Sequence, residues 1–420
     1  MSNHARVTVR VPSRHALDGL TVEEVAPQLA SRPGFVWLDS ADATRGRCVS
    51  VLASDPTRIL TGSISDVRPL RAALAAFPAS QKGDLGLMGP GLYGTVDYEG
   101  SYTFGVYPEV LVYEHASSRW MGKASEFPAR AAKETEVLPP LDFQPRWSRA
   151  AYLSATRRAL DYIAAGDIYQ VNLAQSFAAP APAAAAFPFY ERLRAFSATA
   201  HCSFLNNGTR QLMSASPELF LRMSGSSIQT RPIKGTRARS RDPQQDERLA
   251  YELRTSAKEI AELIMITDLE RNDLGQVCAF GSVRATDLLK LERFEQVFHL
   301  VSSVSGTLRP EIDHLEAFQA CFPGGSISGA PKKRALEIIA ELEPCPRGLY
   351  TGAIGCFGAN GESQFSLAIR TAVAEGGQMH FHTGAGIVAD SCPEREYEET
   401  WHKAATLLGA AGWARGGSGP

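Results

Sequence analysis

The chain lacks the features of several large protein classes. No apolar run approaches the roughly 20 residues that a membrane-spanning helix needs, and Met1–Arg6 leads into alternating Val and Arg rather than an apolar signal core. The formal net charge is only −2, which argues against a nucleic-acid-binding protein or a polybasic membrane surface. These absences favour a cytoplasmic globular protein.

Cysteine pairs and nucleotide-binding motifs are also missing. The seven cysteines are scattered, odd in number and never in a Cys-x-x-Cys pair, which argues against a disulfide framework and a zinc site and for a reducing cytoplasm. No P-loop occurs, and no Gly-x-Gly-x-x-Gly follows a strand. The sequence therefore gives no sign of an ATP- or dinucleotide-binding protein.

The order of the expected elements predicts the fold class. Short β runs fill residues 1–110, and a Pro-rich, charged stretch at 129–146 marks a boundary. Later strands come in antiparallel groups with helices between the groups, which favours a layered α+β fold over a doubly wound parallel sheet. We therefore predict a β-rich subdomain at 1–140, a catalytic domain at 141–410 and a disordered Gly-rich tail at 411–420.

Several segments bear on a site. Ser148 is a plausible N-cap of a helix that stops at Gly166, and the alternating residues 167–177 predict a half-buried strand. Further expectations are a flexible polar segment at 242–252, a long helix from 249 to about 268, one apolar strand at 366–373 and a last helix at 393–408.

The most informative stretch is Arg231–Thr236, in which Lys234 stands between an isoleucine and a glycine at the end of a β-like run. Lysines usually lie on solvated faces. A tight turn among Pro, Ile, Gly and Thr is expected to hold this amine in place, and a desolvated amine can act as a nucleophile or base. On this stretch alone, a surface lysine in a turn remains an alternative.

Two expected helices carry glutamates at i and i+3, which places each pair on one helix face. The pairs are Glu259 with Glu262, and Glu396 with Glu399; Lys403 lies one turn further along. Like charges at this spacing destabilise a helix, and a divalent cation between the two helices would relieve the repulsion. Oxygen ligands favour Mg²⁺, while two solvated helix faces remain the alternative.

Three other kinds of residue predict anion or proton chemistry. Arg370, inside the expected apolar strand, must be paired or point into a site. Glu218 follows a proline in a strand-like run, where a raised pKa would suit a general acid; His299 is more typical of a satisfied core histidine. Gly-rich segments at 323–331, 351–353 and 383–386 can offer backbone N–H groups to an anion, or be simple turns and C-caps.

Taken together, these residues resemble the chorismate-utilising enzymes, the family of anthranilate, aminodeoxychorismate, isochorismate and salicylate synthases. The resemblance is strong over residues 148–408 and weak before them. Its matching segments are 167–177, 214–220, 232–236, 258–275 with Arg271-Asn272-Asp273, 299–304, 322–332, 350–355, 369–371 and 384–403. The resemblance implies a layered core of two antiparallel sheets with helices packed outside.

Lys234 places the resemblance in one branch. Anthranilate synthases carry alanine at this position, whereas Pro-Ile-Lys-Gly-Thr is similar to aminodeoxychorismate synthase component I. There the lysine is thought to attack C2 of chorismate as the C4 hydroxyl, protonated by a residue such as Glu218, leaves. Ammonia then adds at C4 and expels the lysine.

The resemblance also implies the ligands. Mg²⁺ would be bound directly by Glu262 and Glu399, and directly or through water by Glu259 and Glu396. His299 matches an active-site histidine. Substrate would be held by Ser326, Tyr350, Arg370, Gly384, Ala385, Gly386 and Lys403. Ammonia would come from a glutamine amidotransferase subunit, since no Gly-x-Cys-x-Gly nucleophile elbow surrounds any cysteine here.

Three alternatives remain open at this point. Anthranilate synthase component I is disfavoured by Lys234, and an isochorismate or salicylate synthase fits the residues around 232–236 and 167–172 less well. A non-catalytic chorismate-binding homologue is disfavoured because Lys234, Glu218 and the four glutamates are all present.

Overall fold

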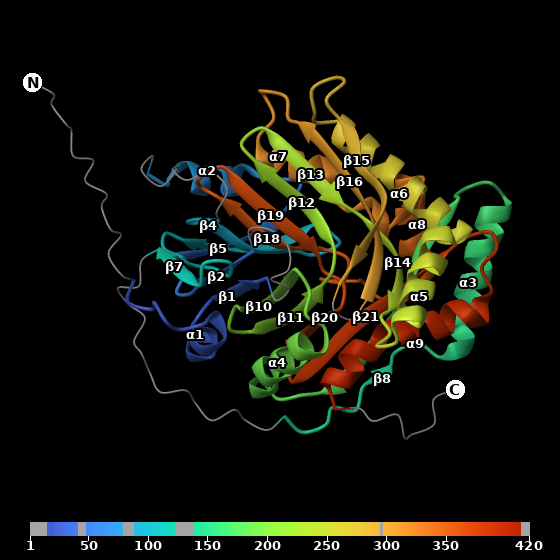
Figure 1. Ribbon diagram of the computed structural model, residues 1–420, viewed down its shortest axis with the longest axis horizontal. Coiled ribbons are helices and arrows are strands. Elements are labelled where there is room, and N and C mark those ends of the chain that lie inside the picture. Colours follow the sequence, from blue (N-terminus) through green and yellow to red (C-terminus); the bar gives the residue numbers. More distant parts are fainter. Residues whose placement is uncertain (1–14, 41–47, 79–87, 123–137, 295–296, 413–420) are drawn as a thin grey trace, which may run out of the picture.

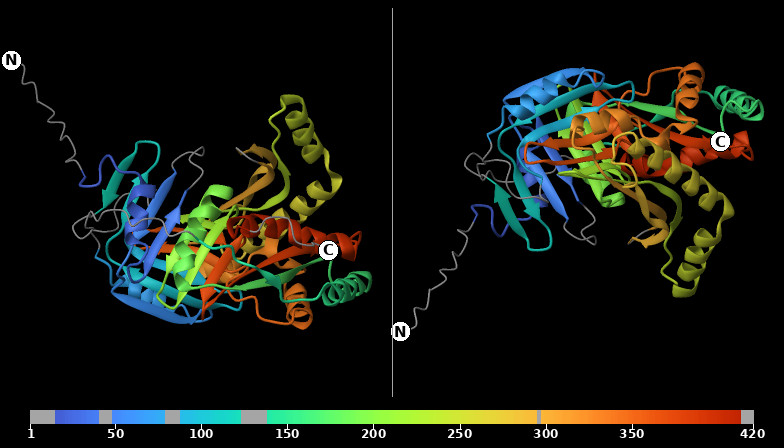
Figure 2. Two further views of the ribbon diagram at one scale, coloured as in Figure 1. Left: turned by 90° about the horizontal axis from the view of Figure 1, so that it is seen from below. Right: turned by 90° about the horizontal axis from the view of Figure 1, so that it is seen from above.

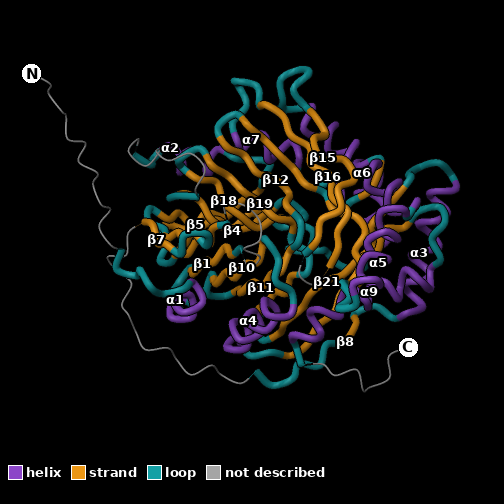
Figure 3. Tube along the Cα trace, viewed as in Figure 1, coloured by secondary structure: helices purple, strands orange, loops and turns teal. Residues whose placement is uncertain are grey.

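Two antiparallel sheets packed against each other form the centre of the protein (Figure 1). The computed structural model describes residues 15–40, 48–78, 88–122, 138–294 and 297–412. Helices surround the strands (Figure 3). The predicted α+β class, with its layered two-sheet antiparallel core, is confirmed.

The first sheet has eleven strands in the order β17-β9-β21-β20-β11-β10-β1-β2-β6-β7, with β8 also paired to β9. Their bounds are β1 Phe35–Asp39, β2 Val49–Ala53, β6 Leu111–Glu114, β7 Arg119–Gly122, β8 Gln144–Pro145, β9 Gln170–Pro180, β10 His201–Asn206, β11 Arg210–Ser216, β17 Gly329–Ala330, β20 Thr371–Glu375 and β21 Gln378–Ile387.

The second sheet has ten strands in the order β14-β16-β13-β12-β19-β18-β4-β5-β3, with β15 also paired to β16. Their bounds are β3 Arg58–Ser63, β4 Gly91–Val96, β5 Ser101–Tyr107, β12 Leu219–Ser224, β13 Ser227–Arg231, β14 Ile233–Ala238, β15 Arg284–Arg293, β16 Val297–Thr307, β18 Ala353–Gly358 and β19 Glu362–Leu367.

Both sheets mix strands from the two ends of the chain. In the first sheet β1 pairs with β10, and in the second β4 pairs with β18. The predicted boundary near residue 140 therefore does not separate the sheets, and it remains a prediction about folding units. The predicted tail at 411–420 lies outside the described residues from 413 onward.

Side-chain alternation explains the layers. Along β1, Phe35 and Trp37 pack in a cluster with α1 and α4 residues, whereas Val36 points to the opposite face and joins a cluster drawn from both sheets. Residues of both sheets, such as Leu212 and Ile354, bury this shared layer. Removal of its apolar surface from water is the main force that holds the sheets together.

Helices cover the outer faces. Helices α3, α4, α8 and α9 pack on the first sheet, and α2, α5 and α6 on the second. Figure 2 shows the yellow helices of residues 243–275 standing out from the sheets. None of the helices described is long and apolar enough to cross a membrane. The bounds are α1 Val22–Leu29, α2 Arg68–Ala75, α3 Arg149–Ala164, α4 Ala186–Phe196, α5 Pro243–Thr255, α6 Ala257–Gly275, α7 His314–Cys321, α8 Lys332–Leu342 and α9 Pro393–Ala410, with short 3-10 turns η2 Ala183–Ala185 and η3 Gly325–Ile327.

The region expected as a flexible segment and one long helix was predicted wrongly. It forms two helices, because Asp242 caps α5 by accepting from the backbone N–H of Gln244, and Ser256 caps α6 by accepting from that of Glu259. Ser256 has extended backbone angles, so the chain changes direction there. A cap inside a polar stretch was the signal for this break.

Candidate active site

A cavity of about 750 Å³ lies where the two sheets, α6 and α9 meet. Its volume falls in the range of small-molecule sites, about 300–1,000 Å³. Twelve of the fourteen residues predicted from the sequence line it: Glu218, Lys234, Glu259, Glu262, His299, Ser326, Tyr350, Arg370, Gly384, Gly386, Glu399 and Lys403.

Two of these residues mark the points where the chain passes from one sheet to the other. Glu218 lies between β11 of the first sheet and β12 of the second, and Arg370 lies between β19 and β20. The two crossings are tied together, because Leu367 N–H donates to the Glu218 carbonyl and Ala215 N–H to the Arg370 carbonyl. The cavity therefore lies where the chain passes twice between the two sheets.

This arrangement corrects the expected strand at 366–373. It is two strands in different sheets, joined at Arg370, whose backbone has φ of 50°. Burial lowers the pKa of Arg370, while the charge of Glu218 opposes that change. A partly buried cation on a cavity wall favours an anionic ligand.

Lys234 lies on β14, half-buried, and its Nζ donates to the Ser326 carbonyl at 3.4 Å. A bulge at Gly235, with φ of 71°, interrupts the pairing of β14 with β16. Next to the bulge, Thr236 Oγ1 and His299 Nδ1 share a hydrogen bond of 2.9 Å. Lys234 and His299, from these two neighbouring strands, both line the cavity.

Glu218 has the surroundings of a general acid. It is only 5% exposed, and burial raises its pKa, although Ser326, Lys234 and Arg370 lie near enough to oppose the shift. Its Oε1 has no hydrogen-bond partner among the described residues, and neither does Ser326 Oγ. A buried carboxyl with an idle oxygen facing a cavity is suited to exchange a proton with a ligand.

Glu259 and Glu262 of α6 and Glu399 of α9 line the same cavity. Burial raises the pKa of Glu262, and the charges of Glu259 and Glu399 raise it further. Burial alone would raise the pKa of Glu399 as well, but Lys403, 2.8 Å away, outweighs it and the net shift is downward. The wall that these helices form therefore holds three carboxylates, each with a cation nearby: Lys403 beside Glu399, Lys258 beside Glu262 and Arg237 beside Glu259.

Glu396 is placed differently. It lies beneath the cavity wall rather than on it, 4% exposed, with Ser391 Oγ donating to Oε1 at 2.7 Å and no described partner for Oε2. Within the described ranges, no three Asp, Glu, His or Cys side chains are close enough together to hold a metal ion. The all-oxygen donors, their mutual repulsion and the orphaned Oε2 fit a divalent cation that shares its ligands with substrate or water.

The segment 383–386, which the sequence left open as a backbone anion site or a turn, belongs to the second half of strand β21. Strand alternation turns Gly384 and Gly386 toward the cavity and the Ala385 side chain into the core below α3. Ala385 therefore does not line the cavity. A Cβ at Gly384 would lie 2.3 Å from Asn172 Oδ1, so any larger residue would have to displace this side chain.

Sequence reasoning missed other cavity residues: Asn172, Arg237, Lys258, His382 and His402. Lys258 Nζ lies 3.9 Å from Glu262 Oε1, and Arg237 Nη1 lies 3.5 Å from Glu259 Oε1. The i, i+4 spacing of Lys258 and Glu262 was a readable signal. His382 stacks on the Tyr350 ring at 5.4 Å, and burial lowers its pKa to about 3.

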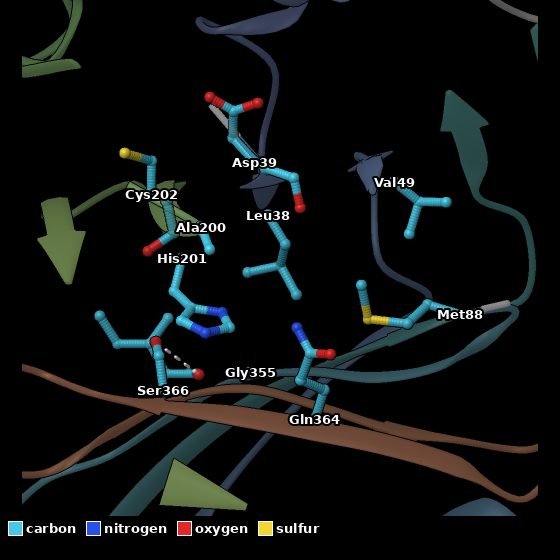
Figure 4. Close-up of a pocket in the computed structure, with 13 residues that line it drawn as sticks. Leu38, Asp39, Val49, Met88, Ala200, His201, Cys202, Gly355, Gln364 and Ser366 are labelled. Carbon is cyan, nitrogen blue, oxygen red and sulfur yellow. Dashed lines mark hydrogen bonds between the residues drawn. The ribbon is translucent and has the colours of Figure 1, made fainter. Parts of the chain in front are cut away.

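A second cavity between the sheets, lined by Asp39, Met88, His201, Cys202 and Gln364 among others, is much smaller (Figure 4). Its volume is about 20 Å³, room for about one water molecule. It is too small for a ring-bearing substrate. A further cavity of about 510 Å³, lined by Ile264, Arg271 and Leu288 among others, contains none of the fourteen predicted residues, so the cavity between α6 and α9 is the candidate active site.

Comparison with known proteins gives consistent matches. A family profile described as "chorismate binding enzyme" covers residues 37–409. Anthranilate synthase component 1 of Thermus thermophilus is 49% identical over 275 residues, which is 66% of this chain and 59% of that protein. Aminodeoxychorismate synthase component 1 of Bacillus subtilis is 42% identical over 284 residues, which is 67% of this chain and 59% of that protein.

A solved structure agrees. That of anthranilate synthase component I from Streptococcus pneumoniae matches with a TM-score of 0.78 and 30% identity, over 86% of this chain and 92% of that one. In the two sequence matches above, the aligned part spans 59% of the relative's length, less than two thirds of either protein.

Proposed function

The chain belongs to the chorismate-binding enzyme family, and we propose that it is an aminodeoxychorismate synthase subunit. The reaction converts chorismate and ammonia to 4-amino-4-deoxychorismate, for para-aminobenzoate and folate synthesis. The observation that carries the proposal is the Lys234 amine, which lines one cavity together with Glu218 and the carboxylates of α6 and α9.

Lys234 is proposed as the nucleophile. Its amine attacks C2 of chorismate, the ring double bonds shift, and the C4 hydroxyl leaves as water after Glu218 protonates it. Ammonia then forms the C4–N bond, the double bonds shift back and the bond between Lys234 and C2 breaks. Two displacements replace one difficult one, as in other covalent mechanisms.

The required protonation states can arise within the site. The positive charge of Lys234 lowers the pKa of Glu218, which means that the two groups interact. Transfer of one proton from the Lys234 ammonium to the Glu218 carboxylate gives a neutral amine and a carboxylic acid, the forms that attack and protonation need. Burial of Glu218 favours its protonated form.

The remaining residues hold the substrate. Arg370 and Lys403 supply positive charge for the two carboxylates of chorismate, and Tyr350 and Ser326 supply hydroxyls. Lys403 Nζ already donates to the Gly384 carbonyl at 2.8 Å, so it is fixed at the strand edge. The backbone of 384–386 is proposed to complete this grip.

The carboxylates of α6 and α9 would hold Mg²⁺, which supplies positive charge to anchor the ring carboxylate when bound. Glu262 and Glu399 would be its direct ligands. Glu259 and Glu396 would contribute directly or through water, which would give the idle oxygen of Glu396 a partner.

A glutamine amidotransferase subunit is the proposed source of ammonia. The two curated relatives are each named "component 1", which marks them as one part of an enzyme with several components. This partner remains part of the proposal.

Anthranilate synthesis is the second candidate, favoured by the 49% identity to an anthranilate synthase component 1. Isochorismate or salicylate synthesis is a third candidate.

A product assay separates these candidates. The purified chain is incubated with chorismate, Mg²⁺ and an ammonium salt, and the products are separated and identified by mass. Aminodeoxychorismate supports the proposal; anthranilate, isochorismate or salicylate as the main product rejects it.

The covalent role is tested with Lys234→Ala. Without the amine, the C4 displacement loses its first step, and formation of aminodeoxychorismate is expected to fall by at least about a hundredfold. Lys290→Ala, an exposed lysine on β15 whose side chain is 54% exposed, is the matched control. Wild-type rates in Lys234→Ala would exclude the covalent role.

A further inference from the structure

Arg347 is a buried cation below the active-site cavity, and all of its N–H donors are used. Nε donates to Glu343 Oε2 at 2.9 Å, and Nη2 donates to Glu343 Oε1 at 2.6 Å and to the Asn172 carbonyl at 2.7 Å. Nη1 donates to the Ile327 carbonyl and to Thr351 Oγ1, both at 3.2 Å. These five bonds match the five donors of a guanidinium.

The acceptors come from separate elements that form the cavity walls. Asn172 lies on β9 and itself lines the cavity, and Ile327 follows Ser326 in η3. Arg347 does not line the cavity, and its side chain is 1% exposed. It therefore acts on the substrate only through these neighbours.

Tyr350 belongs to the same arrangement. The Arg347 guanidinium lies 5.6 Å from the Tyr350 ring centroid and 4.7 Å from that of Tyr98, within the range of cation–π contacts. The next residue, Thr351, has φ of 62°, a conformation that costs energy for a β-branched residue and persists only where its surroundings hold it. Its bond from Arg347 is one of those restraints.

Glu343, the C-cap of α8, completes the unit. Its side chain is 6% exposed, and its Oε1 also accepts from Ala174 N–H on β9 at 2.9 Å. An ion pair this deeply buried is a poor source of stability, because desolvation offsets its attraction and apolar replacements are often neutral or stabilising. Its value must then lie in the geometry that it fixes.

We propose that Arg347, held by Glu343, is a positioning residue that joins β9, η3 and the turn carrying Tyr350 into one rigid wall of the active site. The inference rests on the proposed function only in taking this cavity as the place where chorismate reacts. On this proposal, turnover requires the planar guanidinium with its five donors, and a positive charge alone is not sufficient. A lysine has three donors around one nitrogen and cannot reach all of these acceptors.

The test uses the full chain and separates stability from turnover. In the double variant Arg347→Met with Glu343→Met, the ion pair becomes an apolar pair of similar length. Its melting temperature is expected to stay within a few degrees of wild type, while kcat falls at least about tenfold, because displacement by about 1 Å is costly for a reacting group. Arg347→Lys is expected to give an intermediate kcat at a near wild-type KM.

A second pair of an arginine and a buried carboxylate serves as the control. Arg194, whose side chain is 21% exposed, binds Asp39 at 2.5 Å and lies over the Trp37 ring, and neither member of the pair lines the active-site cavity. Arg194→Met with Asp39→Leu is expected to alter the melting temperature while kcat stays within about twofold of wild type. The assay follows chorismate consumption, so it remains valid if the wild-type product is not aminodeoxychorismate.

Two results would overturn the proposal. One is a wild-type kcat in the Met–Met variant at wild-type melting temperature. The other is a wild-type kcat in Arg347→Lys. If the Met–Met variant does not fold, the kcat of Arg347→Lys alone decides the test. A lowered kcat in a lysine variant that melts like wild type supports the proposal, since a role in stability alone would leave kcat unchanged.

Discussion

Glu270 offers a quantitative test of the electrostatics behind the active site. It lies on α6, 5% exposed, and its carboxyl accepts a hydrogen bond from the Thr230 hydroxyl. Burial raises its pKa from 4.5 to about 8, with smaller contributions in the same direction from Glu218 and Asp273. Thr230 and Lys332 oppose the shift.

The sign of the effect on stability follows from this direction. Between pH 4.5, where the unfolded chain loses this proton, and about pH 8, where the folded chain loses it, the folded state holds more protons. The stabilisation is complete below pH 4.5 and is lost as pH rises through this window. At about 1.4 kcal/mol for each pH unit, the loss is at most about 5 kcal/mol.

Glu270→Gln replaces the ionisable carboxyl group with a neutral amide of nearly the same shape. We expect the melting temperature of the variant to rise relative to that of wild type between pH 5.5 and 9, because glutamine never acquires the buried charge. For a chain of this length, about 1 kcal/mol corresponds to about 1 °C in melting temperature, so the relative gain is about 2–4 °C. Thermal unfolding at several pH values measures it.

Glu398→Gln, the same substitution at an exposed position of α9, is the matched control. If the difference between Glu270→Gln and wild type is independent of pH, Glu270 is not a buried carboxyl that resists ionisation. The same burial argument for Glu218 would then lose its support.

Three further outcomes are expected. Glu218→Gln is expected to lower turnover by about 10²–10⁴-fold. Wild-type activity is expected to fall as pH rises through the raised pKa of Glu218, and the variant is expected to lack this fall. A pH profile that is the same in both proteins counts against Glu218 as the general acid. Gly384→Ala places a Cβ 2.8 Å from the Tyr350 hydroxyl and is expected to raise KM for chorismate about tenfold. The control Gly275→Ala, at a position with open space around it, is expected to leave KM unchanged. Lys258→Gln removes a cation 3.9 Å from Glu262 and is expected to tighten Mg²⁺ binding severalfold by calorimetry; weaker binding would show that the lysine does not compete with the metal.

Local signals in the sequence were sufficient for much of the fold. Ser148 caps α3 as expected, by accepting from Ala151 N–H, and the strand pair near residues 91–106 forms β4 and β5. Periodicity failed where tertiary context decides the outcome. The apolar run at 366–373 reads as one strand, yet its residues divide between two sheets at Arg370, and no local pattern reports which sheet a strand will join.

The site was predictable in its residues and not in its geometry. Helical spacing identified the faces of α6 and α9, but it gave equal weight to Glu396 and Glu399, of which only Glu399 lines the cavity. Glycines at 384 and 386 suggested a turn, because a sequence does not show that their missing side chains leave room for Asn172 and Gln170. Sequence reasoning missed Arg347, because two of its five hydrogen bonds go to backbone carbonyls far away in the chain; Glu343, four residues before it, was its one readable local partner.

The choice of product turns on few atoms. Relatives named for different reactions match this chain over a similar length, and the sheets, the acidic helices and Arg370 suit any reaction that begins with bound chorismate. On the proposed mechanism, amination at C4 rather than at C2 requires an amine beside the ring. Lys234 is the proposed amine, next to a strand bulge and close enough to Glu218 to lower the pKa of that acid. A variant that removes the amine but keeps the bulge, such as Lys234→Ala, should therefore still bind chorismate and Mg²⁺ while losing C4 amination. If chorismate binding is lost as well, the lysine holds the substrate rather than attacking it.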